Sequence, residues 1–111
     1  MTKCLKDIMV VITTCGKEED AKILAQKLIE KRLAACAQVY GPITSYYWWE
    51  GNLEEDTEWQ VKFKILKEKY EDAEKFIRQN HPYELPQIIA IPVEKSLKEY
   101  SLWVAKETNE N

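Results

Sequence analysis

The stretch ITSYYWWEGNLEEDTEWQVKFKI, residues 43–65, decides the fold. An extended arm runs from Ile43 to Glu50 and ends at Gly51-Asn52, a pair typical of tight turns between antiparallel strands. The return arm alternates between apolar Trp59, Val61, Phe63 and Ile65 and polar Glu58, Gln60, Lys62 and Lys64. A period of two is that of a β-strand with one buried face. The stretch therefore predicts a hairpin whose second strand has one face exposed to water or to a partner.

The segments before the hairpin predict a strand, a helix and a second strand. Asp7–Thr14 is a short β-branched apolar run that ends at Cys15-Gly16, which favours a strand in the middle of a sheet. Apolar residues then recur at helical spacing as far as Arg32, at Ala21, Leu24, Ala25, Leu28 and Ile29. Residues 33–37 lead into the first arm of the hairpin, and we expect Gly41-Pro42 to break that arm.

The segments after the hairpin predict a helix, a strand and a short terminal helix. A second amphipathic helix carries Tyr70, Ala73, Phe76 and Ile77. It must end near Asn80, because Pro82 and Pro86 disfavour helical geometry in the residues before them. Ile88–Val93 predicts the fourth strand, and Ser96-Leu97-Lys98-Glu99 predicts a capping box for the last helix. The apolar stripe of that helix is Leu97, Tyr100, Trp103 and Val104.

The order β-α-β-β-α-β predicts an α+β fold of the ferredoxin-like kind, formed by residues 1–111 as a single domain. Both helices then cover one face of a four-stranded antiparallel sheet, and the short C-terminal helix follows. Tyr46, Tyr47, Trp48 and Trp49 are consecutive, so both faces of that strand carry large rings and one helical layer covers only one of them. We expect another subunit to cover the rest. The alternative is that the rings pack against each other at the hairpin tip.

Charge, hydropathy and cysteine content exclude several classes of protein. The net charge of −3 comes from interleaved acidic and basic residues, so no basic run is available to bind nucleic acid. The longest apolar runs, Ile8–Ile12 and Ile88–Ile91, are too short to span a bilayer, and the N-terminus shows no signal-peptide core. We therefore expect a cytoplasmic protein with no membrane partner. The cysteines, Cys4, Cys15 and Cys36, are odd in number and form no C-x-x-C pair, which predicts reduced thiols.

Four motifs in order along the chain resemble the CutA divalent-cation-tolerance family: residues 33–37 (LAACA), residues 45–51 (SYYWWEG), His81-Pro82-Tyr83-Glu84-x-Pro86 and Tyr100-x-x-Trp103. The resemblance implies a ferredoxin-like subunit that pairs strands with its neighbours in a tight homotrimer, with an architecture similar to that of the PII signalling trimers. It also implies a role in tolerance of copper and other divalent metals. The homotrimer agrees with the aromatic hairpin read from the residues alone.

Direct binding of copper or another divalent metal is the first functional hypothesis, and its predicted contacts are His81, Cys36 and Glu58. Imidazole and thiolate suit copper and zinc, and the only histidine lies in a proline-rich turn, where loops commonly carry function. The family resemblance implies a copper site with a first-strand cysteine and a pair of histidines, and this chain has Thr13 and Asn80 at two of those three positions. The alternatives are a packing role for Cys36 and a hydrogen-bonded turn role for His81.

A cleft between subunits is the second functional hypothesis. The resemblance implies that Lys64, Tyr83 and Trp103, together with Glu58, line such a cleft and offer a cation, a phenol, an indole and an acid to a small polar ligand. The family's Lys-Thr pair is Lys64-Ile65 here, so no hydroxyl neighbours the cation. The alternatives are a solvated strand face for Lys64 and the core side of the last helix for Trp103.

The sequence predicts a protein that binds and is not an enzyme. It contains no Ser-His-Asp set that can be assembled and no phosphate-cradling glycine loop, and residues 15–20 are acidic where an acylphosphatase needs an arginine. We therefore expect a trimeric metal-response protein. The rival hypotheses are a PII-like sensor of a small organic ligand and a structural hub for a protein partner.

Overall fold

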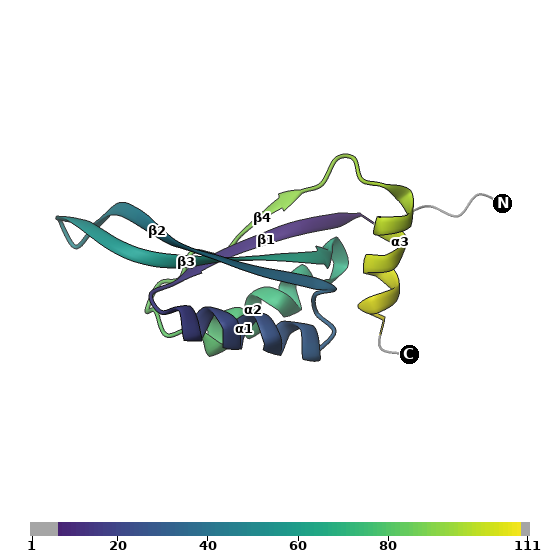
Figure 1. Ribbon diagram of the computed structural model, residues 1–111, viewed down its shortest axis with the longest axis horizontal. Coiled ribbons are helices and arrows are strands. Elements are labelled where there is room, and N and C mark those ends of the chain that lie inside the picture. Colours follow the sequence, from purple (N-terminus) through teal and green to yellow (C-terminus); the bar gives the residue numbers. More distant parts are fainter. Residues whose placement is uncertain (1–6, 110–111) are drawn as a thin grey trace.

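A four-stranded antiparallel sheet organises residues 7–109, which are the residues that the computed structural model describes (Figure 1). The strand order is β2-β3-β1-β4. The strands are β1 (Ile8–Cys15), β2 (Cys36–Trp49), β3 (Asn52–Leu66) and β4 (Ile89–Pro92). The helices are α1 (Glu18–Glu30), α2 (Tyr70–Asn80) and α3 (Lys98–Glu107), and a 3-10 turn, η1 (Lys67–Lys69), precedes α2. The predicted α+β fold is confirmed, and Cys4 lies outside the described residues.

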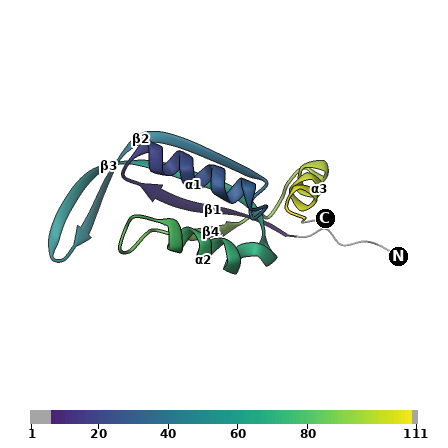
Figure 2. The ribbon, with the colours of Figure 1, turned by 90° about the horizontal axis from the view of Figure 1, so that it is seen from below.

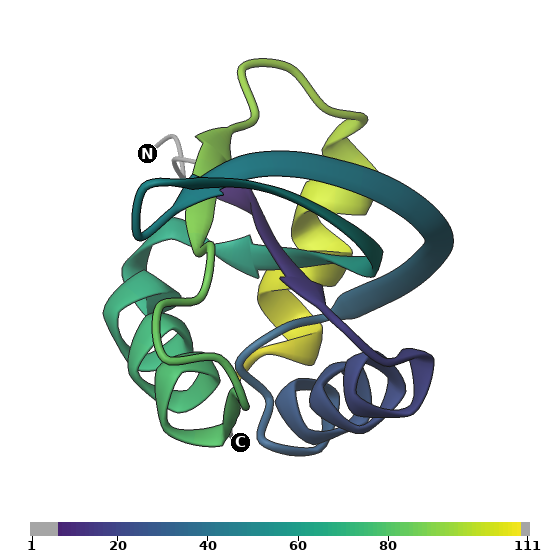
Figure 3. The ribbon, with the colours of Figure 1, turned by 90° about the vertical axis from the view of Figure 1, so that its left-hand side faces the viewer.

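Both long helices cover the same face of the sheet, α1 beside α2 (Figures 2 and 3). The alternation predicted for the return arm of the hairpin decides which side chains they bury. Val61, Phe63 and Ile65 on β3 are fully buried against the helices, together with Val11 on β1 and Leu28 on α1. Burying large apolar side chains supplies most of the folding free energy of a domain of this size. The core therefore lies between the helices and the part of β3 that pairs with β1.

The α3 helix lies beyond one end of the sheet, where Val104 is fully buried beside Ile8 and Leu66 (Figure 1). The predicted capping box is wrong. Leu97 is the N-cap residue and its side chain makes no cap hydrogen bond, while the Ser96 hydroxyl accepts a hydrogen bond from the Ser101 hydroxyl at 2.9 Å. The apolar stripe predicted for this helix also includes solvent-exposed residues, since Leu97 is 71% and Trp103 is 41% exposed.

The hairpin of β2 and β3 projects well past the rest of the sheet (Figure 1). Pairing between β1 and β3 stops at Cys15 opposite Trp59, whereas β2 and β3 stay paired as far as Trp49 opposite Asn52. The predicted break at Gly41-Pro42 is instead a β-bulge within a continuous strand, with a cis peptide bond between these two residues. Gly41 is required there, because a Cβ atom at this position would lie 2.7 Å from Cδ1 of Trp59.

The projecting hairpin exposes large apolar side chains. The most exposed are Trp48 at 73%, Tyr46 at 66% and Leu53 at 63%. Mutual packing of the rings at the hairpin tip, one of the two alternatives raised by the sequence, therefore does not bury them. A two-stranded hairpin without a covered face is only marginally stable in water, so this part of the chain lacks a cover of its own.

Candidate functional site

A group of polar and titratable side chains meets where the projecting hairpin leaves the sheet. Three segments contribute to it: the end of β1, the part of β3 at the root of the hairpin, and the loop that follows α2. His81 is the C-cap residue of α2, with an extended backbone that turns the chain away from the helix axis. Two prolines follow closely in the sequence, which is why α2 ends here as predicted. The loop thereby carries His81 and Tyr83 to the end of β1.

Both ring nitrogens of His81 are engaged. Nε2 lies 2.8 Å from the carbonyl oxygen of Thr14, and Nδ1 accepts a hydrogen bond from the backbone N–H of Tyr83 at 3.1 Å. A carbonyl oxygen can only accept, so Nε2 carries the proton of a neutral imidazole. His81 is 9% exposed, and burial lowers its pKa, although the hydrogen bond to Thr14 and the charges of Asp20 and Glu58 act in the opposite direction. The predicted turn role of His81 is what the structure shows.

Cys15 is the site neighbour that the sequence analysis did not select. Its Sγ lies 3.8 Å from Nε2 of His81, and the residue is fully buried. Burial raises the pKa of the Cys15 thiol to about 11, and the negative charges of Asp20 and Glu58 add to the effect. A thiol with so high a pKa is a poor nucleophile and a poor metal ligand at neutral pH. The Cys15-Gly16 pair marked only the end of a strand in the sequence, and its contact with His81 spans 66 residues.

Glu58 and Tyr83 form the second part of the group. The Tyr83 hydroxyl donates a hydrogen bond of 2.7 Å to Oε2 of Glu58. Glu58 is only 6% exposed. Burial and the neighbouring carboxylate both raise the pKa of Tyr83, so the phenol stays protonated and remains a donor. Gly16 leaves room for the phenol, since a Cβ atom there would lie 3.0 Å from the Tyr83 hydroxyl oxygen.

The other predicted site residues lie toward the α3 end of the same sheet. Cys36 is opposite Lys64 in the ladder of β2 and β3, six positions along β3 from Glu58 (64 − 58 = 6). At about 3.3 Å per residue, these ends are roughly 20 Å apart. The Lys64 ammonium donates to Oε1 of Gln38, and burial together with the neighbouring Cys36 raises the pKa of Tyr100. The Trp103 ring lies 5.6 Å from the ring of Tyr100, centroid to centroid.

The predicted metal donors therefore do not form one site within a chain. Glu58 and His81 lie at the root of the hairpin, whereas Cys36 lies toward the α3 end of the sheet. Across residues 7–109, no three histidine, cysteine or acidic side chains are grouped so that they could hold a metal ion. Thr13, which the family resemblance places where a copper-binding cysteine was expected, offers a hydroxyl and not a thiolate, and that hydroxyl has no partner among the described residues. A preformed metal centre does not fit the donors that one chain brings together.

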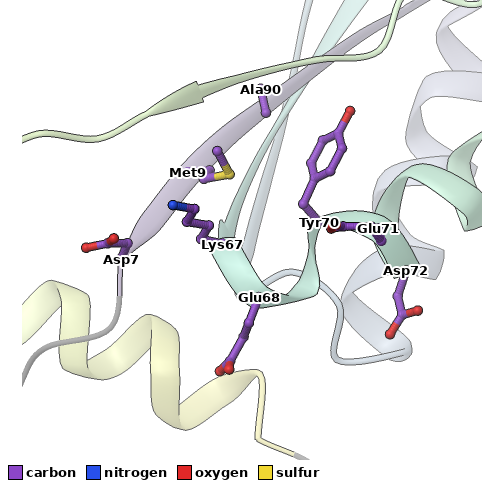
Figure 4. Close-up of a pocket in the computed structure, with 8 residues that line it drawn as sticks. All are labelled: Asp7, Met9, Lys67, Glu68, Tyr70, Glu71, Asp72 and Ala90. Atoms are coloured by element: carbon purple, nitrogen blue, oxygen red, sulfur yellow. The ribbon is translucent and has the colours of Figure 1, made fainter.

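The predicted ligand cleft is divided in the same way. Tyr83 lies with Glu58, whereas Lys64 and Trp103 lie toward α3. Two cavities lie elsewhere in residues 7–109, and none of these four side chains lines either of them. The larger one, about 730 Å³, opens beside the start of α2, where Met9, Ala90 and Tyr70 form its apolar surface and Asp7 and Lys67 lie at its edge (Figure 4). A smaller one of about 230 Å³ lies between α1 and α2 and reaches His81, with Asp20, Lys27 and Asn80 among its lining.

Comparison with known proteins gives a consistent result. Residues 9–107 match the family model for the CutA1 divalent ion tolerance protein. The chain is 40% identical over 97 residues to the divalent-cation tolerance protein CutA of Thermotoga maritima, covering 87% of this chain and 95% of that protein. It is 39% identical over 101 residues to the mouse protein CutA, of which it spans 57% while 91% of this chain is covered.

Solved structures extend the similarity to the fold. A CutA1 from Oryza sativa superimposes with a TM-score of 0.92 at 31% identity, over 96% of this chain and 98% of the other. The structure of the periplasmic divalent cation tolerance protein CutA from Archaeoglobus fulgidus gives a TM-score of 0.89 at 35% identity, over 92% and 99% of the two chains. In the part of the chain that the structure describes, no helix is long and apolar enough to cross a membrane.

Proposed function

The chain belongs to the CutA1 divalent ion tolerance family, and from that premise we propose that it acts in divalent-cation tolerance as a homotrimer that binds rather than catalyses. The family is named for tolerance of cations and not for a reaction. The observation that supports an assembled form is the projecting hairpin, whose Trp48 and Tyr46 are exposed on an element that one chain leaves uncovered. A cytoplasmic location stays a prediction from the sequence.

The two free edges of the sheet favour assembly between identical chains. β2 and β4 are the edge strands, and an exposed edge with apolar side chains is a surface that readily pairs with another chain. On β4, Ile89 is 46% and Ile91 is 50% exposed. Closed rings of identical subunits are the usual way to cover such surfaces without open-ended growth. We propose that three chains pair their edges and cover the hairpins.

Metal binding in this proposal requires donors from more than one subunit. The reason is the distance along β3: Cys36 lies opposite Lys64, six positions along the strand from Glu58, so one chain cannot bring Cys36 and Glu58 to the same ion. Copper or another divalent ion would have to find donors such as thiolate and carboxylate where two subunits meet. Cys36 and Glu58 as its contacts stay a prediction, and so does His81, whose two ring nitrogens already have hydrogen-bond partners within the chain.

Native mass spectrometry of the purified chain tests both parts, with Cu²⁺ added stepwise. The expected result is a trimer that takes up a defined number of ions. A monomer would contradict the assembly and the reading of the hairpin. A trimer that remains metal-free would contradict direct metal binding, and thermal stabilisation by a small organic compound without metal would then favour the PII-like sensor. Stoichiometric co-purification of another protein would favour the structural hub.

A further inference from the structure

Three segments of the chain are held together by hydrogen bonds among four residues. We call these residues the clasp: Thr14, Glu58, His81 and Tyr83. His81 bonds to the main chain of Thr14 at 2.8 Å and to the main chain of Tyr83 at 3.1 Å, and Tyr83 bonds through its hydroxyl to Glu58 at 2.7 Å. The rings of His81 and Tyr83 also lie against each other, with centroids 4.9 Å apart. The clasp thus links the end of β1 to the root of the hairpin through the loop after α2.

The imidazole at the centre of the clasp has no lone pair to spare. A metal ion binds imidazole through the lone pair of an unprotonated ring nitrogen. In His81, Nε2 is protonated toward the Thr14 carbonyl, and the lone pair of Nδ1 is used by the Tyr83 N–H. We infer that His81 is the positioning residue of the clasp and not a metal ligand: its imidazole fixes the main chain of Tyr83 so that the phenol reaches Glu58.

The surroundings of His81 agree with a positioning role. The nearest thiol, that of Cys15, is fully buried and lies 3.8 Å from the nitrogen that carries the proton. The small cavity between α1 and α2 reaches the ring, with Asp20 and Lys27 in its lining, so an ion that entered it would meet one charge of each sign. No third donor joins the pair among residues 7–109.

The position of the clasp in the fold indicates what it holds in place. Trp59 is the β3 residue nearest to the hairpin tip that still pairs with β1. Glu58 is its neighbour on the side of the tip. The loop on the other side of the clasp leads into the edge strand β4. The clasp therefore fixes the root of the projecting hairpin relative to the start of β4. Its purpose in assembly rests on the proposed trimer, whereas its geometry does not.

Nitrogen-15 NMR of the imidazole tests the inference on the intact protein, because His81 is the only histidine in the chain. Long-range proton–nitrogen correlation spectra would be recorded with and without excess Zn²⁺, which is diamagnetic. We expect a protonated Nε2, an unprotonated Nδ1, and no change in either resonance when Zn²⁺ is added. The opposite tautomer, or a shift or broadening of either ring nitrogen with Zn²⁺, would overturn the inference.

The same sample separates this inference from the proposed function. If mass spectrometry finds Zn²⁺ on the protein while the imidazole resonances stay unchanged, the clasp is supported and the metal is held by other side chains. If no Zn²⁺ is bound and the tautomer is as expected, the clasp is supported and direct metal binding fails.

A double-substitution cycle tests whether His81 acts through Tyr83. The cycle compares His81→Ala, Tyr83→Phe and the double variant by their thermal midpoints. Because His81 positions the phenol, Tyr83→Phe should cause little further loss once His81 is removed. The matched control is Tyr70→Phe, which removes a hydroxyl bonded to Glu74 at the start of α2 and should lower the midpoint equally with or without His81. Equal losses from Tyr83→Phe in both backgrounds would contradict the positioning role.

Discussion

The two halves of strand β3 lie in opposite environments. Between Trp59 and Leu66, the strand pairs with β1 throughout and with β2 as far as Lys64, and helices cover one of its faces. Between Asn52 and Glu58, it has only β2 beside it, and no helix covers either face (Figure 1). The first half is covered by its own chain, whereas the second is left exposed, and in the proposed trimer another chain covers it. The clasp lies at the boundary between the two halves. This position agrees with the inferred role of the clasp, which is to fix the orientation of the hairpin relative to the sheet.

The largest expected effect is on the half that the chain completes by itself. Phe63 is fully buried between the sheet and the helices, so Phe63→Ala should lower the free energy of unfolding by about 3–5 kcal/mol. Urea unfolding followed by circular dichroism measures this loss. The control is Leu53→Ala in the projecting half, where the side chain is 63% exposed, measured at a concentration at which the protein is monomeric. Equal losses at both positions would remove the contrast between the halves.

The second effect concerns the half that lacks a cover. Trp48→Ser should dissociate the proposed trimer and leave the subunit folded, because Trp48 is 73% exposed in the chain and is not part of its core. Light scattering after size exclusion gives the subunit number, and circular dichroism checks the fold. Ile23→Ser is the control, since this side chain is 42% exposed on α1, in the helical layer away from the hairpin. A Trp48→Ser protein that remains fully trimeric would show that the hairpin is not the assembling surface.

The third effect is at the boundary. Tyr83→Phe removes the hydroxyl that bonds to the buried carboxylate of Glu58, and leaving such a group without its partner costs about 1–3 kcal/mol. The exposed pair of Tyr47 and Asp56 provides the comparison, because water replaces a lost hydrogen bond there, and Tyr47→Phe should change the free energy of unfolding by less than about 0.5 kcal/mol. Denaturant midpoints of the two variants measure the difference. Losses of the same size would mean that burial does not distinguish the two pairs.

The sequence predicted the completed half of β3 well and the boundary poorly. Alternation along the return arm identified Val61, Phe63 and Ile65 as core, because a period of two is a local property that burial on one face imposes directly. For the four rings of residues 46–49, the sequence predicted that the chain leaves one face of the strand uncovered, and the structure leaves all four exposed. Each of these predictions needed only neighbours in the chain.

The candidate site depended on contacts that a local pattern does not contain. Tyr83 and Glu58 were both selected for the predicted cleft, but only from the family resemblance, because their hydrogen bond joins residues 25 positions apart. Cys15 was missed because a cysteine at the end of an apolar strand gives no signal of the imidazole that packs beside it. The capping box failed for a related reason: the helix begins at Lys98, one residue later than the box requires, so Ser96 finds a side-chain partner in Ser101 instead.

The smallest expected effect is the pH dependence that the clasp adds to stability. Burial lowers the pKa of His81 below its ordinary value of 6.5, so near and below that pH the unfolded chain binds a proton more readily than the folded chain does. The stabilisation from the neutral imidazole is fully present above pH 6.5 and is lost as the pH falls from 6.5 toward the lower pKa of the folded state. Protonation of Nδ1 would also break its hydrogen bond with the Tyr83 N–H, because a protonated nitrogen can no longer accept. Unfolding free energies at pH 7.5 and at pH 5.5, for the native chain and for His81→Gln, isolate this contribution, because all other titratable groups are the same in the two proteins. We expect the native chain to lose more stability than the variant on acidification. An identical loss would show that the imidazole is not held neutral, and the hydrogen bond between Tyr83 and Nδ1 that defines the clasp would then have to be abandoned.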